Sequence, residues 1–112
     1  MALFKVLRKN REYRKVYKFG NSVADRNIVL FVLPNNLDFS RFGFTVSKKV
    51  GNAVVRNRVR RLFKEACRLN LHEFPLCRDY ILLARSNVVG KNYHAVEKSL
   101  LKLLKRLGLP KG

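Results

Sequence analysis

The amino-acid sequence predicts an α+β fold, a two-layer sandwich in which helices pack on a small mixed sheet. Three segments repeat apolar residues at helical spacing, and the runs between them are β-branched or alternate in the manner of strands. Taken along the chain, these elements follow the order α-β-β-α-β-α. The chain has 112 residues with no internal repeat, low-complexity tract or linker, so we expect a single domain over residues 1–112.

The first predicted element is a short helix near the N-terminus. Asn10 is expected to cap its start, and Tyr13, Val16 and Tyr17 recur at i, i+3 and i+4, so they share one face. Gly20 suits the position after the last turn, where the backbone often enters the left-handed region. The helix therefore has one apolar face that includes two aromatic rings.

Two strands are predicted after this helix. The β-branched run at 28–33, which Pro34 stops, predicts the first of them. Residues 41–47 alternate apolar with polar or small side chains, which indicates a strand with one face on the core. The residues near 22–23 allow an additional short strand.

The C-terminal half is predicted to alternate helix, strand and helix. A long helix is expected over 53–69, followed by a loop at 72–78, a strand at 80–84, a connection at 86–92 and a last helix over 93–107. A glycine and a proline just beyond the last helix end it. The apolar stripe of that helix consists of Tyr93, Val96, Leu100, Leu103, Leu104 and Leu107.

The charge of the chain is strongly positive. It has 25 Lys and Arg against 7 Asp and Glu, for a formal net charge of +18 at pH 7. So much like charge opposes compaction, and a partner that cancels it is expected. Hydrophobic residues make up 47% of the chain, which is enough for a core and argues against a disordered basic tail. We expect a polyanion as the partner, and nucleic acid is the commonest one.

A membrane surface is the rival explanation for this cationic character. No segment approaches the roughly 18 consecutive apolar residues of a spanning helix, and the N-terminus lacks the apolar run of a signal peptide. Cys67 and Cys77 form neither a CxxC pair nor a disulfide framework, and both are expected to be small core residues. We therefore expect a cytoplasmic protein with no membrane partner.

The helix at 53–69, which Asn52 is expected to cap, has the most informative pattern. At about 100° per residue its apolar side chains gather on one face and its cations on the other, with Arg58 beside the apolar stripe. Lys48 and Lys49 add charge beside its N-terminus, whose free N–H groups also favour phosphate. The apolar face consists of Val55, Val59, Leu62, Phe63, Ala66 and Leu69. The polar face consists of Arg56, Asn57, Arg60, Arg61, Lys64 and Arg68.

An ordinary solvated face is the alternative explanation for these cations, and three features argue against it. Glu65 is the only carboxylate on the helix, so most of these cations have no acidic residue on the helix with which to form an i,i+4 ion pair. Arg56 and Arg58 lie near the helix start, where the dipole disfavours cations. Arg outnumbers Lys on this helix, and its planar fork suits bidentate phosphate contacts and stacking on bases. The pattern therefore predicts a face that binds nucleic acid.

The segment GNAVVRNRVRR at 51–61 resembles the RNR signature of the bacterial ribonuclease P protein family. The segment before it, FTVSKKV at 44–50, matches that family's lead-in strand and loop, and the resemblance extends to 7–20 and 79–85. It spans nearly the whole chain in the same order of elements. A long ungapped signature in its proper context is far more specific than basic charge alone.

The resemblance implies the protein subunit of an endoribonuclease that is a ribonucleoprotein and removes the 5′ leader from precursor tRNA. In that family the RNA subunit has the catalytic site and binds the Mg²⁺ ions, so this chain is expected to hold no catalytic residue, metal or cofactor and to need no protein oligomer. The residues implied to contact the RNA subunit are Lys48, Lys49, Asn52, Arg56, Asn57, Arg58, Arg60, Arg61, Lys64 and Arg68.

The resemblance also implies a fold like domain 2 of ribosomal protein S5. Its unusual feature is a left-handed βαβ crossover, here from the strand at 41–47 through the basic helix to the strand at 79–85. The general rule predicts a right-handed crossover, so the left hand comes from the resemblance alone.

The same family binds the single-stranded 5′ leader in a cleft between the first helix and the sheet. The matching residues are Tyr13, Tyr17 and Phe31. Aromatic rings stack on bases without demanding a sequence, which makes the assignment chemically reasonable. The alternative is that Tyr13, Val16 and Tyr17 only dock the helix on the core. Phe31 has the least support, because its neighbours are all apolar.

A protein-borne nuclease site is not indicated by the sequence. Two-metal phosphoryl chemistry needs carboxylates that hold ions about 4 Å apart, and no two of the 7 acidic residues have a recognisable ligand spacing. His72 and His94 belong to no metal or catalytic motif and are expected at the surface. Composition alone also fits a structural protein of the ribosome and a binder of double-stranded nucleic acid. Only the signature at 51–61 and its context favour ribonuclease P.

Overall fold

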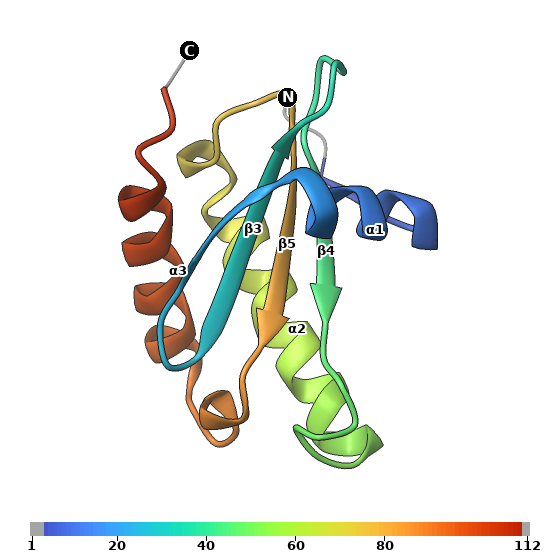
Figure 1. The fold of residues 1–112 in the computed structure, drawn as a ribbon. Coiled ribbons are helices and arrows are strands. Elements are labelled where there is room, and N and C mark those ends of the chain that lie inside the picture. The colour runs from blue at the N-terminus through green and yellow to red at the C-terminus, as the bar shows by residue number, and fades with distance from the viewer. Residues whose placement is uncertain (1–3, 111–112) are drawn as a thin grey trace.

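The computed structural model describes residues 4–110, which form one mixed sheet with three α-helices (Figure 1). The strands are β1 (Lys5–Val6), β2 (Asn21–Ala24), β3 (Ile28–Pro34), β4 (Arg41–Thr45) and β5 (Arg78–Ala84). The helices are α1 (Asn10–Phe19), α2 (Ala53–Leu69) and α3 (Tyr93–Leu107). The predicted α+β class and the predicted order of the main elements are confirmed.

The strands lie side by side in the order β1-β4-β5-β3-β2. β4 is parallel to both of its neighbours, β1 and β5, whereas β3 is antiparallel to β5 and β2. β2 is the short strand that the sequence allowed near 22–23. β1 was not predicted, because a strand of two residues is too short for an alternating pattern to reveal it.

The connection from β4 through α2 to β5 is a left-handed crossover. In Figure 1, β4 lies to the right of β5, both strands run downward, and α2 passes behind the sheet. The chain therefore turns in the opposite sense from almost all βαβ units. The hand implied by the family resemblance is confirmed, and the general rule alone would be wrong here.

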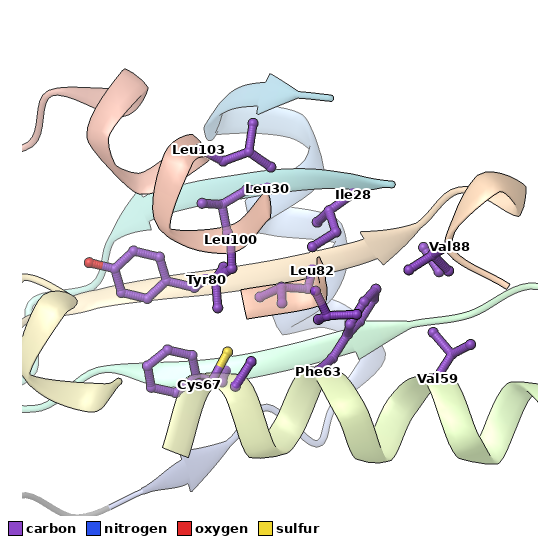
Figure 2. Close-up of a cluster of buried hydrophobic side chains, with 14 of the residues drawn as sticks. Ile28, Leu30, Val59, Phe63, Cys67, Tyr80, Leu82, Val88, Leu100 and Leu103 are labelled. Atoms are coloured by element: carbon purple, nitrogen blue, oxygen red, sulfur yellow. The ribbon is translucent and has the colours of Figure 1, made fainter. Parts of the chain in front are cut away.

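The main hydrophobic core lies between the sheet and the layer formed by α2 and α3 (Figure 2). Leu30 of β3, Leu82 of β5, Phe63 of α2 and Leu100 of α3 are completely buried in it. This half of the molecule is the predicted sandwich of helices on a sheet. The predicted stripe of α3 faces the core, with four of its members buried and two partly buried at its edge.

The opposite face of the sheet is covered by α1. Val16 of α1, Ile81 of β5 and Leu7 form a second, smaller buried cluster, and Tyr13 and Phe31 pack against it. Successive residues of a strand point to opposite faces, so β5 serves both clusters. The short helix is therefore fixed across the sheet by apolar contacts along one face.

The predicted cap of the first helix is wrong. Asn10 is the first residue inside α1 rather than its cap. The exposed N–H groups of Arg8 and Lys9 instead donate to Oε1 of Glu12, at 3.2 and 3.0 Å. A carboxylate at the third helical position reaches back to the helix start and carries a full negative charge there. The pKa of Glu12 is lowered, mainly by the hydrogen bond from the N–H of Lys9. Partial burial acts in the opposite direction, but the hydrogen bond from Arg8 and the charge of Arg41 lower the pKa further, so the net shift is downward.

Gly20 follows α1 as predicted, but for a different reason. Its φ of −78° is extended rather than left-handed. A Cβ atom there would lie 2.6 Å from the carbonyl oxygen of Val16 and 2.7 Å from that of Val32. Glycine is therefore required by the close approach of two backbone segments. Gly108, in contrast, has a φ of 63° and ends α3 in the left-handed conformation expected of it.

Some boundaries and burials differ from the predictions. β4 ends at Thr45, where its pairing with β5 stops, and β5 begins at Arg78 because it pairs with the last residue of β3. Leu69, predicted on the apolar face of α2, is 51% exposed because it is the last residue of the helix. Cys67 is buried as predicted, whereas Cys77 is exposed in the turn before β5.

Candidate nucleic-acid interface

The basic face of α2 is directed away from the core. The buried residues of the helix are Val59, Phe63, Ala66 and Cys67. Among the residues predicted to contact RNA, the exposed ones are Lys48, Lys49, Asn52, Asn57, Arg58, Arg61, Lys64 and Arg68. The other two, Arg56 and Arg60, are partly buried. The predicted division of this helix into an apolar side and a basic side is confirmed.

Five of these residues are engaged within the protein, among them Arg60, which donates to Oδ1 of Asn57 at 3.1 Å. The side chain of Asn52 accepts a hydrogen bond of 3.0 Å from the N–H of Val55, which confirms the predicted cap of α2. Arg68 forms an ion pair with Glu65, and Arg58 donates to the carbonyl oxygen of Lys91 at 3.3 Å. No carboxylate in residues 4–110 forms an ion pair with the cations of Arg56, Arg61 or Lys64, so their charges remain available to an anion.

A hollow of about 540 Å³ lies between α1 and β4 and reaches α2. Two of the three predicted leader residues, Tyr13 and Tyr17, line this hollow, whereas Phe31 does not. Arg60, predicted for the RNA subunit, lies in its wall as well. The structure therefore brings the two predicted sites together at Arg60. Sequence reasoning did not anticipate this junction, or the contribution of Thr45 to the wall.

Tyr17 is held at the edge of this hollow by contacts with the sheet. Its hydroxyl lies 2.6 Å from Oγ1 of Thr45. Its ring meets that of Phe31 edge to face, with the ring centroids 4.9 Å apart and the planes at 82°. Phe31 thus supports Tyr17 from the sheet side. Tyr17 is still 36% exposed, so it docks the helix and also presents part of its ring to the solvent.

Tyr13 lies over β4 with the outer end of its ring packed against Gly43. A Cβ atom on Gly43 would lie 2.7 Å from Cε2 of Tyr13, so a larger residue would displace the ring. The hydroxyl of Tyr13 donates to the carbonyl oxygen of Leu7 at 3.4 Å, and burial raises its pKa, so it stays protonated at neutral pH. Gly43 was not predicted to matter, although a glycine inside a strand often marks such a close approach.

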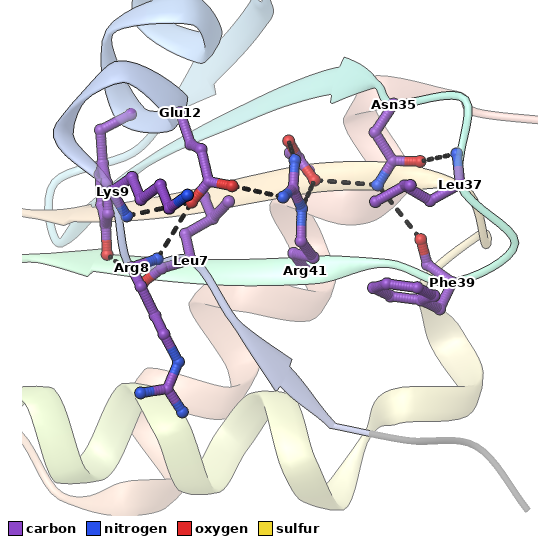
Figure 3. A network of polar contacts seen from close by, with 10 residues as sticks. Leu7, Arg8, Lys9, Glu12, Asn35, Leu37, Phe39 and Arg41 are labelled. Atoms are coloured by element: carbon purple, nitrogen blue, oxygen red, sulfur yellow. Dashed lines mark hydrogen bonds and ion pairs between the residues drawn. The ribbon is translucent and has the colours of Figure 1, made fainter.

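A polar network fixes the start of α1 to the sheet (Figure 3). Arg41 of β4 donates from Nε and Nη2 to the two carboxylate oxygens of Asp79, at 2.9 and 2.7 Å, and from Nη1 to Glu12 at 2.5 Å. Asn35 donates to the same Asp79 at 2.9 Å, and Asp79 is only 4% exposed. The network therefore joins α1, β4 and β5, and it gathers two acidic residues around an arginine.

The described residues offer no cluster suited to a metal ion. Among residues 4–110, no three His, Cys, Asp or Glu side chains are grouped so that they could bind one. His72 and His94 are exposed, as predicted. In the same residues, no helix is long and apolar enough to cross a membrane.

Comparison with known proteins places this geometry in a family. The family described as Ribonuclease P matches residues 1–108. The chain belongs to the ribonuclease P protein family. It is 50% identical over 106 residues to the ribonuclease P protein component of Pelotomaculum thermopropionicum, covering 95% of each chain. It is 44% identical over 103 residues to that of Alkaliphilus metalliredigens, covering 92% of this chain and 93% of the relative.

Solved structures of ribonuclease P proteins share the fold. The protein from Staphylococcus aureus matches with a TM-score of 0.85 at 33% identity, covering 94% of this chain and 96% of that one. The protein from Thermotoga maritima matches with a TM-score of 0.83 at 30% identity, covering 91% and 96%. Membership of the ribonuclease P family thus decides against the two alternatives that composition left open.

Proposed function

We propose that this chain is the protein subunit of ribonuclease P, the ribonucleoprotein that removes the 5′ leader from precursor tRNA. The observation that supports this best is the family match over residues 1–108. In this proposal the RNA subunit performs the phosphodiester chemistry with Mg²⁺, and the protein contributes affinity rather than a catalytic group. We place the protein in the cytoplasm, and it acts without a second copy of itself.

The RNA subunit is proposed to bind the basic face of α2 and the loop before it. The exposed cations there support this, since neutralising phosphates releases condensed counterions and so favours binding. The residues in this surface are Lys48, Lys49, Asn52, Arg56, Asn57, Arg58, Arg60, Arg61, Lys64 and Arg68. Asn52 and Arg68 contribute least, because the cap and the Glu65 ion pair already occupy their polar groups.

The single-stranded 5′ leader is proposed to lie in the hollow between α1 and β4. The exposed part of the Tyr17 ring offers a stacking platform, and Phe31 keeps that ring in place from below. Arg60 in the same wall is positioned to contact a leader phosphate close to the RNA subunit. By screening the repulsion between the two RNAs, the protein would also raise the affinity for Mg²⁺ where they meet.

Cleavage of precursor tRNA at low Mg²⁺ tests the function directly. We expect cleavage at the mature 5′ end when a bacterial ribonuclease P RNA and this protein are both present. The protein alone should remain inactive, because the proposal gives it no catalytic group. If the folded protein binds the RNA but gives no stimulation, the proposed function is wrong.

Tyr17→Ala should weaken the binding of precursor tRNA to the holoenzyme and leave mature tRNA unaffected. Loss of one base stack is worth about 1–3 kcal/mol, or roughly 5- to 150-fold in affinity. Phe19→Ala is the matched control, because Phe19 is 63% exposed on the same helix and does not line the hollow. Equal losses for precursor and mature tRNA, or an equal loss in the Phe19 variant, would contradict the leader assignment.

A further inference from the structure

A second hollow, of about 370 Å³, lies where three loops meet at one end of the sheet. These loops follow β2, β4 and β5, and Figure 1 shows all three at the lower end of the sheet. Each loop contributes one cation to the wall, namely Arg26, Lys49 and Arg85. Ser47, Ser86 and Asn87 add polar groups, and no lining residue is acidic. Of the three cations, only Lys49 belongs to the predicted RNA surface.

The positive charge of this hollow is not neutralised within the described residues. Arg26, Lys49 and Arg85 form no ion pair among residues 4–110. Arg85 donates from Nη1 to the backbone carbonyl of Asp25 at 3.0 Å, which orients the guanidinium group without cancelling its charge. Like charges that the fold holds together repel each other, and a bound anion would relieve that repulsion.

The carboxylate of Asp25, the acidic group beside Arg85, is directed to other partners. Its Oδ1 accepts the N–H groups of Asn27 at 2.8 Å and Ile28 at 2.9 Å, and its Oδ2 lies 3.5 Å from Nζ of Lys102. Asp25 is therefore occupied in closing the turn between β2 and β3. It holds the backbone that carries Arg26 and anchors Arg85, and it leaves the charge of the hollow positive.

The chemistry of the wall selects one part of a nucleic acid. Guanidinium, ammonium, hydroxyl and amide groups are the donors that most often bind phosphate oxygens. The lining includes no aromatic ring, so nothing in this hollow offers a base a stacking surface. A phosphodiester of an RNA backbone fits this set of groups, and its recognition would not depend on the base sequence.

We propose that this hollow binds a backbone phosphate of the ribonuclease P RNA subunit. The proposal rests on the function proposed above and extends the RNA surface around the end of the sheet, from α2 to the turn between β2 and β3. Lys49 belongs both to this hollow and to the basic loop before α2, which makes the two surfaces continuous. The hollow shares no lining residue with the hollow between α1 and β4 that is proposed to hold the 5′ leader (the leader hollow), so the RNA subunit is the nearer source of phosphate.

The test uses Arg26→Gln, Arg85→Gln and the double variant in binding to a bacterial ribonuclease P RNA over a range of salt concentrations. Loss of this one phosphate contact should lower the log–log salt slope by about 0.7–0.9. The double variant should show that full loss and each single variant no more than it, because both arginines face the same phosphate. Lys98→Gln is the matched control, because it removes one exposed cation from α3, outside both hollows. Arg85→Lys keeps the charge and should retain the slope.

The outcomes separate this site from the function on which it rests. If both single variants bind with the affinity and slope of Lys98→Gln while an Arg60→Ala, Arg61→Ala variant loses both, the phosphate site is wrong and the proposed function stands. If the unchanged protein does not prefer ribonuclease P RNA over an unrelated RNA of equal length, both the phosphate site and the proposed function are wrong. A holoenzyme assembled beforehand with the Arg26 or Arg85 variants should bind precursor tRNA with the same salt slope as the unchanged holoenzyme. A loss confined to that step would assign the phosphate to tRNA and overturn the proposal.

Discussion

Replacing Arg60 and Arg61 together by alanine is expected to weaken binding of the RNA subunit and to flatten its dependence on salt. Each phosphate contact contributes about 0.9 to the log–log slope on a duplex, so the double variant should lose about 1.8. Raising the salt from about 50 to 200 mM lowers the affinity of both proteins. The fold-loss for the double variant should be about 12 times smaller than the fold-loss for the unchanged protein. Equilibrium binding measured at several salt concentrations gives this slope directly.

The two single variants should differ, because the two side chains have different surroundings. Arg61 is exposed, and Arg61→Ala should affect only the binding of the RNA subunit. Arg60 is partly buried, donates to Oδ1 of Asn57 at 3.1 Å and lines the leader hollow. Arg60→Ala should therefore also weaken the binding of precursor tRNA to an assembled holoenzyme. An unchanged slope in the double variant would show that neither residue contacts the RNA.

The elements that could be predicted from sequence are those defined by local periodicity. In a helix such as α2, residues of one face recur about every 3.6 positions, so the sequence shows both faces. The strand β3 is a continuous apolar run, and β4 alternates apolar with polar or small residues. The basic face of α2 follows from the same rule, because residues on one face are close in sequence. The handedness of the crossover has no such local signal, and only the family resemblance pointed to the left-handed form.

The walls of the leader hollow could be predicted only in part, because they depend on how α1 crosses the sheet. Tyr13 and Tyr17 belong to one helical face, but Thr45 comes from β4 and Arg60 from α2. Contacts between elements so far apart in sequence leave no periodic signal. Gly43 could have been noticed in the sequence, because a glycine inside a strand often marks a close approach of another group. That the group is the ring of Tyr13 is evident only from the structure.

The hollow formed by Arg26, Lys49 and Arg85 shows the same limit for charge. Each cation lies in a different loop, where a lone Lys or Arg usually indicates only a solvated surface. Their convergence follows from the strand order, in which the loops after β2, β4 and β5 come together at one end of the sheet. Net charge therefore predicted the class of partner, whereas the grouping of these three cations in one hollow could not be predicted from it.

Arg41→Met is expected to destabilise the protein by about 3–5 kcal/mol, because it leaves a buried carboxylate without its cation. The side chain of Asp79 is only 6% accessible, and Arg41 provides two of its hydrogen bonds. Asp79→Ala should cost less, about 1–3 kcal/mol, because Arg41 remains 24% accessible and keeps its ion pair with Glu12. Urea unfolding of both variants measures these differences.

The double variant Arg41→Met, Asp79→Leu should be more stable than Arg41→Met alone, because it removes the unpaired charge and fills the space with apolar groups. Lys98→Met, a change at an exposed cation, should stay within about 0.5 kcal/mol of the unchanged protein. If Arg41→Met behaves like Lys98→Met, or if Asp79→Ala costs more than Arg41→Met, the network does not stabilise the fold in this way. Because the network also ties Glu12 at the start of α1 to β4 and β5, a folded Arg41→Met protein should discriminate less between precursor and mature tRNA.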